Sequence, residues 1–138
     1  MNFRKLFIFS VFALVLLTSG CERTKEQWQF ERKIILPKEA RPLALAKDEE
    51  ALWFSDADYF RLHKIDLNGK VWDSITRIHR TMNIHMDKET LYRPEFLTDT
   101  IWQYKKGKTS PLKINKRPQA PAGVSVYGDT ILVADFYN

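Results

Sequence analysis

The stretch Ile131-Leu132-Val133-Ala134-Asp135 decides the fold, because the chain carries it in three versions. The other two versions are Leu52-Trp53-Phe54-Ser55-Asp56 and Leu91-Tyr92-Arg93-Pro94-Glu95. Each is a short run of mainly aliphatic and aromatic residues that ends in an acidic residue. The three acidic residues are 39 and 40 positions apart, so the sequence contains an internal repeat.

A second element of the repeat precedes each of these stretches. It begins at Pro42, Met82 and Ala122, which are spaced 40 positions apart. Both elements have the length and composition of short β-strands. A period of about 40 residues built from short strands is typical of a β-propeller, in which each repeat forms one blade. The sequence therefore predicts an all-β fold, a partial β-propeller with four-stranded antiparallel blades.

The repeat divides the chain into two and a half blades. Residues 41–76 make blade one, residues 81–115 make blade two, and residues 121–138 make half of blade three. Asn68-Gly69 and Lys106-Gly107 are hairpin turn signals at corresponding places in the first two blades. The expected strands are 43–47, 51–55, 62–67, 70–75, 83–86, 90–93, 100–105, 108–114, 123–127 and 130–134.

Residues 1–20 have the features of a signal peptide. Two basic residues, Arg4 and Lys5, precede an apolar run from Leu6 to Leu17, and small residues follow. The apolar run is shorter than the roughly 20 residues that a membrane-spanning helix needs. We therefore expect a cleaved signal-peptide helix, with an uncleaved N-terminal anchor as the alternative.

Cys21 is the only cysteine, so an intrachain disulfide is excluded. The run Thr18-Ser19-Gly20-Cys21 resembles the lipobox of bacterial lipoproteins, although leucine is usual where Thr18 stands. The resemblance implies that Cys21 is lipidated and becomes the mature N-terminus, with residues 21–27 as a polar tether. Since two or three acyl chains attach a protein stably to a membrane, the expected location is the bacterial cell envelope.

The charge of the chain argues against nucleic acid as a partner. The formal net charge is +5, and acidic and basic residues are interspersed. The densest basic run, from Lys105 to Arg117, straddles a predicted turn and an exposed edge. Nucleic-acid binding requires a concentrated basic face, whereas such a run is usually a solvated surface.

Acidic residues recur where the second strand of each blade meets the next loop. In a propeller these loops share one face, so Asp56, Glu95 and Asp135 are expected there together. Carboxylates around a funnel are suitable ligands for a hard divalent cation. The alternative, which we favour, is that each carboxylate accepts backbone N–H bonds and locks its own turn. The further members of this possible ligand or metal face are Asp58, Asn83 and Asp99, beside Arg41, His79 and Arg80.

Three motifs carry a family resemblance. The stretch from Ile131 to Asn138 has a strand ending in Val-Ala-Asp and an Asn three positions later, and His63-Lys64-Ile65-Asp66 precedes Asn68-Gly69-Lys70. The third motif is Ala120-Pro121-Ala122-Gly123-Val124, at the expected start of an inner strand. These motifs resemble NHL-repeat and SMP-30/gluconolactonase-like propellers, particularly six-bladed propeller lipoproteins of bacteria. The resemblance implies that residues 28–36 form a closing strand, which pairs with the last blade of a ring.

The resemblance also limits the expected function. SMP-30-type enzymes hold a divalent metal on acidic and Asn side chains near the starts of the inner strands, where only Asn83 is suitable here. We therefore expect a membrane-anchored lipoprotein that binds a ligand, a protein or a carbohydrate, without a cofactor and without catalysis. A metal-dependent lactonase- or lyase-like hydrolase is the alternative. Two and a half blades leave strand edges open, so we expect a truncated product or an assembly of copies.

Overall fold

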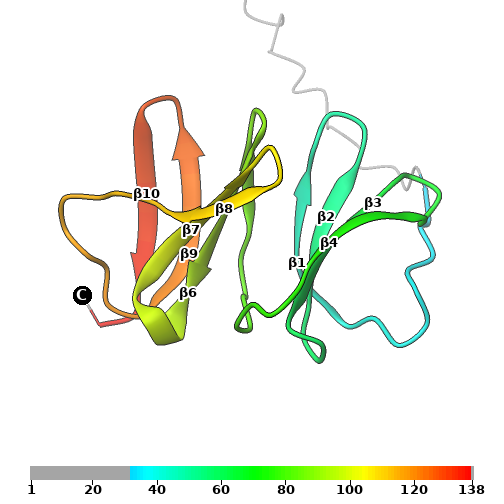
Figure 1. The fold of residues 1–138 in the computed structure, drawn as a ribbon, viewed down its shortest axis with the longest axis horizontal. Coiled ribbons are helices and arrows are strands. Elements are labelled where there is room, and N and C mark those ends of the chain that lie inside the picture. The colour runs from blue at the N-terminus through cyan, green and yellow to red at the C-terminus, as the bar shows by residue number, and fades with distance from the viewer. Residues whose placement is uncertain (1–31, 138) are drawn as a thin grey trace, which may run out of the picture. The chain divides into compact units, whose positions relative to one another are not determined.

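The computed structural model describes residues 32–137, which form three antiparallel sheets without an α-helix (Figure 1). The first two sheets have four strands each, ordered β1-β2-β3-β4 and β5-β6-β7-β8, and the third pairs β9 with β10. The predicted all-β, propeller-like fold is therefore confirmed. The strands are β1 (Pro42–Lys47), β2 (Leu52–Asp56), β3 (Arg61–Ile65), β4 (Val71–Ile75), β5 (His85–Asp87), β6 (Thr90–Glu95), β7 (Thr100–Lys105), β8 (Lys108–Pro111), β9 (Pro121–Tyr127) and β10 (Thr130–Asp135). One 3₁₀ turn, η1 (Phe96–Thr98), joins β6 to β7.

The hairpin between β3 and β4 forms where the sequence predicts it, with a longer loop than Asn68-Gly69 alone. The Asp66 carboxylate accepts the backbone N–H groups of Asn68 and Lys70 at 2.8 and 2.9 Å. Gly69 has a φ of +87° and donates its N–H to the Asp66 carbonyl. A left-handed glycine after such a turn lets the strands pair with their natural twist.

Apolar side chains from facing sheets make one core between the first and second sheets. Its buried members are Ala46, Trp53 and Leu62 from the first sheet, Leu91 from the second, and Ile78 and Ile84 from the linker between them. Complete burial of a large apolar side chain contributes roughly 1.5–3 kcal/mol. This shared core fixes the two sheets face to face, so neither sheet buries its apolar side chains by itself.

Polar contacts add to the packing of β9 against the second sheet. The Asn83 side-chain oxygen accepts the Val124 N–H at 2.8 Å, and the His85 Nε2 lies 3.1 Å from the Val126 carbonyl oxygen. Val124 and Val126 are themselves buried. Asn83 precedes β5 instead of opening it as predicted.

The predicted strand over residues 28–36 is wrong for its described part, residues 32–36, which adopt no strand. The backbone there passes beside the β3–β4 loop, since a Cβ placed on Gly69 would lie 2.3 Å from the Ile35 carbonyl oxygen. The alternation of apolar and polar residues marks a strand only where a neighbouring strand supplies hydrogen bonds.

The predicted signal peptide, Cys21 and the tether lie outside the described residues. Within residues 32–137, no helix has the length and apolar character that crossing a membrane requires.

Candidate functional site

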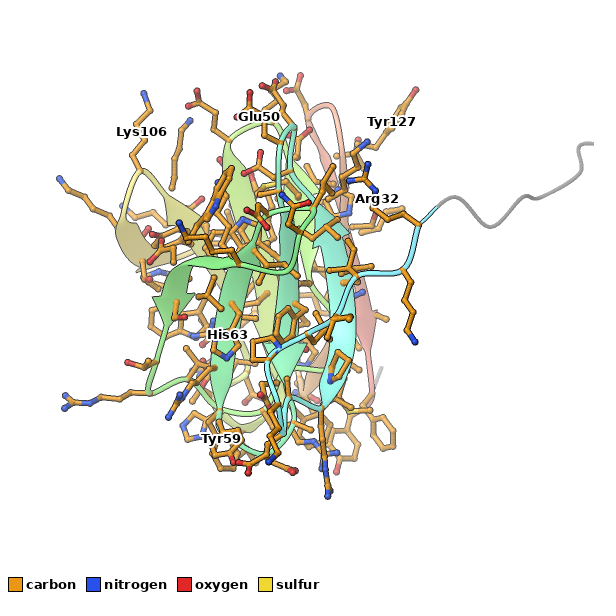
Figure 2. The ribbon with its side chains drawn as sticks, turned by 90° about the vertical axis from the view of Figure 1, so that its right-hand side faces the viewer. Arg32, Glu50, Tyr59, His63, Lys106 and Tyr127 are labelled. Atoms are coloured by element: carbon orange, nitrogen blue, oxygen red, sulfur yellow. The ribbon has the colours of Figure 1, made fainter. Side chains whose placement is uncertain are left out.

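The sheets have two ends, and the predicted site residues occupy one of them. Figure 2 shows Tyr59, in the β2–β3 loop, at the opposite end from Glu50, Lys106 and Tyr127, which lie in or beside the turns that follow β1, β7 and β9. We call the end with Tyr59 the loop end. It holds the loops that leave β2 and β6, as the propeller interpretation predicts.

Two of the three recurring carboxylates lock local turns. The Asp56 Oδ1 accepts the Asp58 N–H at 3.0 Å, and Asp56 is only 3% exposed. The Asp135 Oδ2 accepts the Gln119 N–H at 2.7 Å, and its Oδ1 lies 3.4 Å from the Tyr137 N–H nitrogen. The bonds from the Asp58 and Tyr137 N–H groups lie within the turn, as the turn-locking interpretation predicts, whereas the bond from Gln119 connects Asp135 to the segment before β9.

Glu95 corrects that interpretation, because its side chain does not cap the turn that follows. The Glu95 Oε2 accepts a hydrogen bond from the Arg93 Nη1 at 3.2 Å, and its Oε1 lies 3.4 Å from the His79 Nε2. Glutamate has one methylene more than aspartate, so its carboxylate reaches past the turn. The result is a row of three ionisable side chains, His79–Glu95–Arg93.

The remaining predicted residues have separate partners. Asp58 forms a surface ion pair with Arg41 at 3.0 Å, and the Asp99 Oδ1 accepts the Ala120 N–H at 2.8 Å. Asn83 holds β9, as described above. Across residues 32–137, no group of three His, Cys, Asp or Glu side chains is placed to hold a metal ion.

A pocket of about 310 Å³ opens among the loop-end residues. Its walls come from all three sheets and the linker between the first two. The sequence predicts two of its residues, His79 and Arg80, on this face, but does not predict its apolar walls. Those walls include Phe60, Met82, Pro94, Phe96, Leu97 and Pro121.

The row of ionisable side chains, His79–Glu95–Arg93, extends from the pocket wall into the protein interior. His79 is largely exposed and lines the pocket, whereas Glu95 and Arg93 are 3% and 6% exposed. Burial lowers the pKa of Arg93, and the adjacent Glu95 carboxylate opposes that shift. The Arg93 guanidinium also lies 5.5 Å from the centre of the Trp102 ring. Arg93 and Glu95 are two residues apart on β6 and therefore point to the same side of the sheet.

A second hollow, of about 300 Å³, lies at the opposite end and includes Lys106. Its charged groups contact one another. The Lys64 Nζ lies 2.6 Å from the Asp48 Oδ2, the Tyr104 hydroxyl donates to the Asp73 Oδ2 at 2.8 Å, and Lys106 pairs with Glu89. These internal pairs give the hollow a structural role, so the loop-end pocket is the candidate site.

Comparisons with known proteins identify the fold and no family. No family model matches the chain, and no curated protein matches it. The computationally designed Ika4 protein superposes with a TM-score of 0.59 at 11% identity, over 78% of this chain and 68% of that one. Hydrazine synthase of Kuenenia stuttgartiensis superposes with a TM-score of 0.57 at 16% identity, over 78% of this chain. The match spans 33% of that enzyme chain, and identities this low indicate a shared fold without indicating a shared function.

Proposed function

We propose that this chain is a lipid-anchored binding module of the bacterial cell envelope, with an NHL-like, propeller-type domain that holds a small ligand at its loop end. The observation that carries the proposal is the pocket of about 310 Å³, walled by apolar residues from three sheets. Concave, mainly apolar pockets with a few polar groups are the usual form of small-molecule sites.

The pocket lining favours binding over hydrolysis. Among residues 32–137, its only ionisable residues are His79 and Arg80, and no serine, cysteine, threonine or carboxylate lines it. Nucleophilic hydrolysis needs an activated nucleophile beside a base, and metal-assisted hydrolysis needs a set of protein ligands. Metal-dependent SMP-30-type hydrolysis is therefore the weaker candidate, since Asn83, its one suitable residue here, holds the Val124 N–H.

Membrane attachment is the part of the proposal that comes from residues 18–21. Mass spectrometry of the mature protein from a bacterial host tests it. We expect an acylated Cys21 at the N-terminus, and we expect Cys21→Ser to abolish the modification. An unmodified Cys21, or an intact signal sequence, would contradict lipid anchoring.

Methionine methyl groups provide a direct test of ligand binding. Met82 lines the loop-end pocket, whereas Met86 lines the hollow at the other end. The full chain, labelled with ¹³C-methyl methionine in lipid nanodiscs, is titrated with a panel of neutral and charged aromatic and aliphatic compounds. We expect compounds that shift the Met82 signal and leave Met86 in place. A panel that never shifts Met82 would refute a small-molecule site here.

A further inference from the structure

The charge around the loop-end pocket identifies the chemical class of its ligand. Two residues of its lining are ionisable: Arg80, which is always cationic, and His79. Among the residues that the structure describes, Arg80 forms no hydrogen bond or ion pair, so its five donors remain available.

The acidic group paired with His79 does not cancel this charge. Glu95 lies behind His79, is 3% exposed, and has Arg93 3.2 Å from its Oε2. The buried pair of Glu95 and Arg93 is neutral overall, and its carboxylate is already occupied on both oxygens. The charge that the pocket presents to an incoming molecule is therefore that of Arg80, with His79 adding to it when protonated.

The rest of the lining sets the shape of the ligand. Met82 and Leu97 are 69% and 74% exposed, and the Phe96 ring is 40% exposed beside them. Such exposure of adjacent large apolar residues marks a surface that binds a partner. A volume of about 310 Å³ lies at the small end of the range for ligand pockets, which excludes a large cofactor.

Resting on the proposed binding function, we propose that the pocket takes a small organic carboxylate with an apolar body, whose carboxylate pairs with Arg80. Guanidinium groups bind carboxylates through two parallel hydrogen bonds, a geometry that an amide or alcohol does not reproduce with the same strength. The apolar body lies against Met82, Phe96 and Leu97.

Two probes of the same size, one anionic and one neutral, test this inference. The full chain, with ¹³C-methyl methionine in nanodiscs, is titrated with 3-phenylpropanoate and separately with 3-phenylpropanamide, and empty nanodiscs correct for partitioning. The Met82 signal reports binding. We expect the carboxylate to bind about fivefold more tightly than the amide, the scale of one partly exposed charged pair.

Arg80→Gln is the decisive variant, because Arg80 is exposed and glutamine is a polar replacement that carries no charge. It should remove the preference for the carboxylate, because the positive charge that distinguishes the two probes is gone. Arg77→Gln is the matched control, since Arg77 lies three residues earlier on the same linker, is exposed and does not line the pocket. The control should keep the full preference.

The outcomes separate this inference from the proposed function. Equal affinity for the two probes, or an undiminished preference in Arg80→Gln, overturns the carboxylate inference and leaves the binding function standing. A Met82 signal that neither the probes nor any compound of the wider panel shifts overturns both.

Discussion

Glu95 stands where the other two repeats carry aspartate, and this single methylene changes the contacts of the carboxylate. Asp56 and Asp135 accept backbone N–H groups, whereas Glu95 reaches Arg93 and His79. A buried ion pair is costly to break, because removing one partner leaves the other charge in an apolar surrounding. The repeat position therefore binds backbone N–H groups in two places and a pair of ionisable side chains in the third.

The Arg93–Glu95 pair yields a stability prediction. Glu95→Ala should lower the free energy of unfolding by about 3 kcal/mol, because it leaves the Arg93 charge buried without its partner. Adding Arg93→Met should recover part of that loss, since the charge is then gone. Urea unfolding of the wild type, both single variants and the double variant gives the coupling energy. If the losses in unfolding free energy of the two single variants simply add up in the double variant, Arg93 and Glu95 do not stabilise each other.

Asp48 yields a prediction about pH. Burial raises the pKa of Asp48, but the hydrogen bonds from Lys64 and the Glu49 N–H lower the pKa by more, so it lies below its ordinary value. A carboxylate with a depressed folded pKa stabilises the fold above its unfolded pKa, and this contribution disappears as the pH falls through the folded value. Asp48→Asn should therefore destabilise the protein at pH 6 and have little effect once the pH has fallen below the folded pKa of Asp48.

Unfolding free energies of the wild type and Asp48→Asn, measured from pH 6 down to the acid limit of folding, test this prediction. Asp58→Asn is a suitable control, because Asp58 forms its ion pair on the exposed surface with Arg41. A destabilisation by Asp48→Asn that stays constant across the pH range would mean that the Asp48 charge has no role in it.

At the scale of elements, two glycines in equivalent outer hairpins have different surroundings. Gly69 and Gly107 both have positive φ, +87° and +77°. A Cβ on Gly107 meets no atom within 4 Å, whereas a Cβ on Gly69 would lie 2.3 Å from the Ile35 carbonyl oxygen. Gly107→Ala should therefore cost about 1 kcal/mol, the strain of a left-handed alanine.

Gly69→Ala should cost clearly more than Gly107→Ala, because the backbone at Ile35 must also move away. Thermal and urea unfolding of the two variants provide the comparison. Equal losses would show that the segment before β1 adjusts without cost, and so does not hold a fixed place beside the β3–β4 loop.

These elements also show what the sequence is able to predict. The order and approximate ends of ten strands follow from alternating apolar residues and from turn residues such as Gly69 and Gly107, which are local signals. The segment at residues 32–36 has a similar pattern but adopts no strand, because pairing depends on a neighbour that local pattern does not report. Local sequence patterns therefore predict a strand correctly where its partner strand is adjacent in the sequence.

The pocket was only partly predictable for the same physical reason. His79 and Arg80 could be placed at the loop end from the propeller topology, but Phe60, Phe96 and Leu97 come from loops that have no periodicity. One missed signal was available. Arg93 and Glu95 alternate on one strand, and opposite charges two residues apart in a buried strand indicate an ion pair on one face.

At the scale of the whole molecule, β10 is the outer strand of a two-stranded sheet and pairs on one side only among the described residues. Its register with β9 places Leu132 opposite Ser125, and both are exposed, while Val133 and Val124 share the other face. Leu132 is 61% exposed and Tyr127 at the end of β9 is 85% exposed. An open strand edge beside exposed apolar side chains is a template for pairing with another chain.

We therefore expect the full chain to self-associate through β10. Leu132→Lys should weaken this association without loss of stability, because it puts a charge on an exposed strand face and removes no buried contact. Leu67→Lys is the control, since it makes the same change at a leucine that is 42% exposed in the β3–β4 loop, outside β10. Sedimentation velocity over a range of protein concentrations measures the effect. If Leu132→Lys and wild type sediment alike as monomers at all concentrations, the β10 edge is already protected, and the exposed leucine is not an association surface.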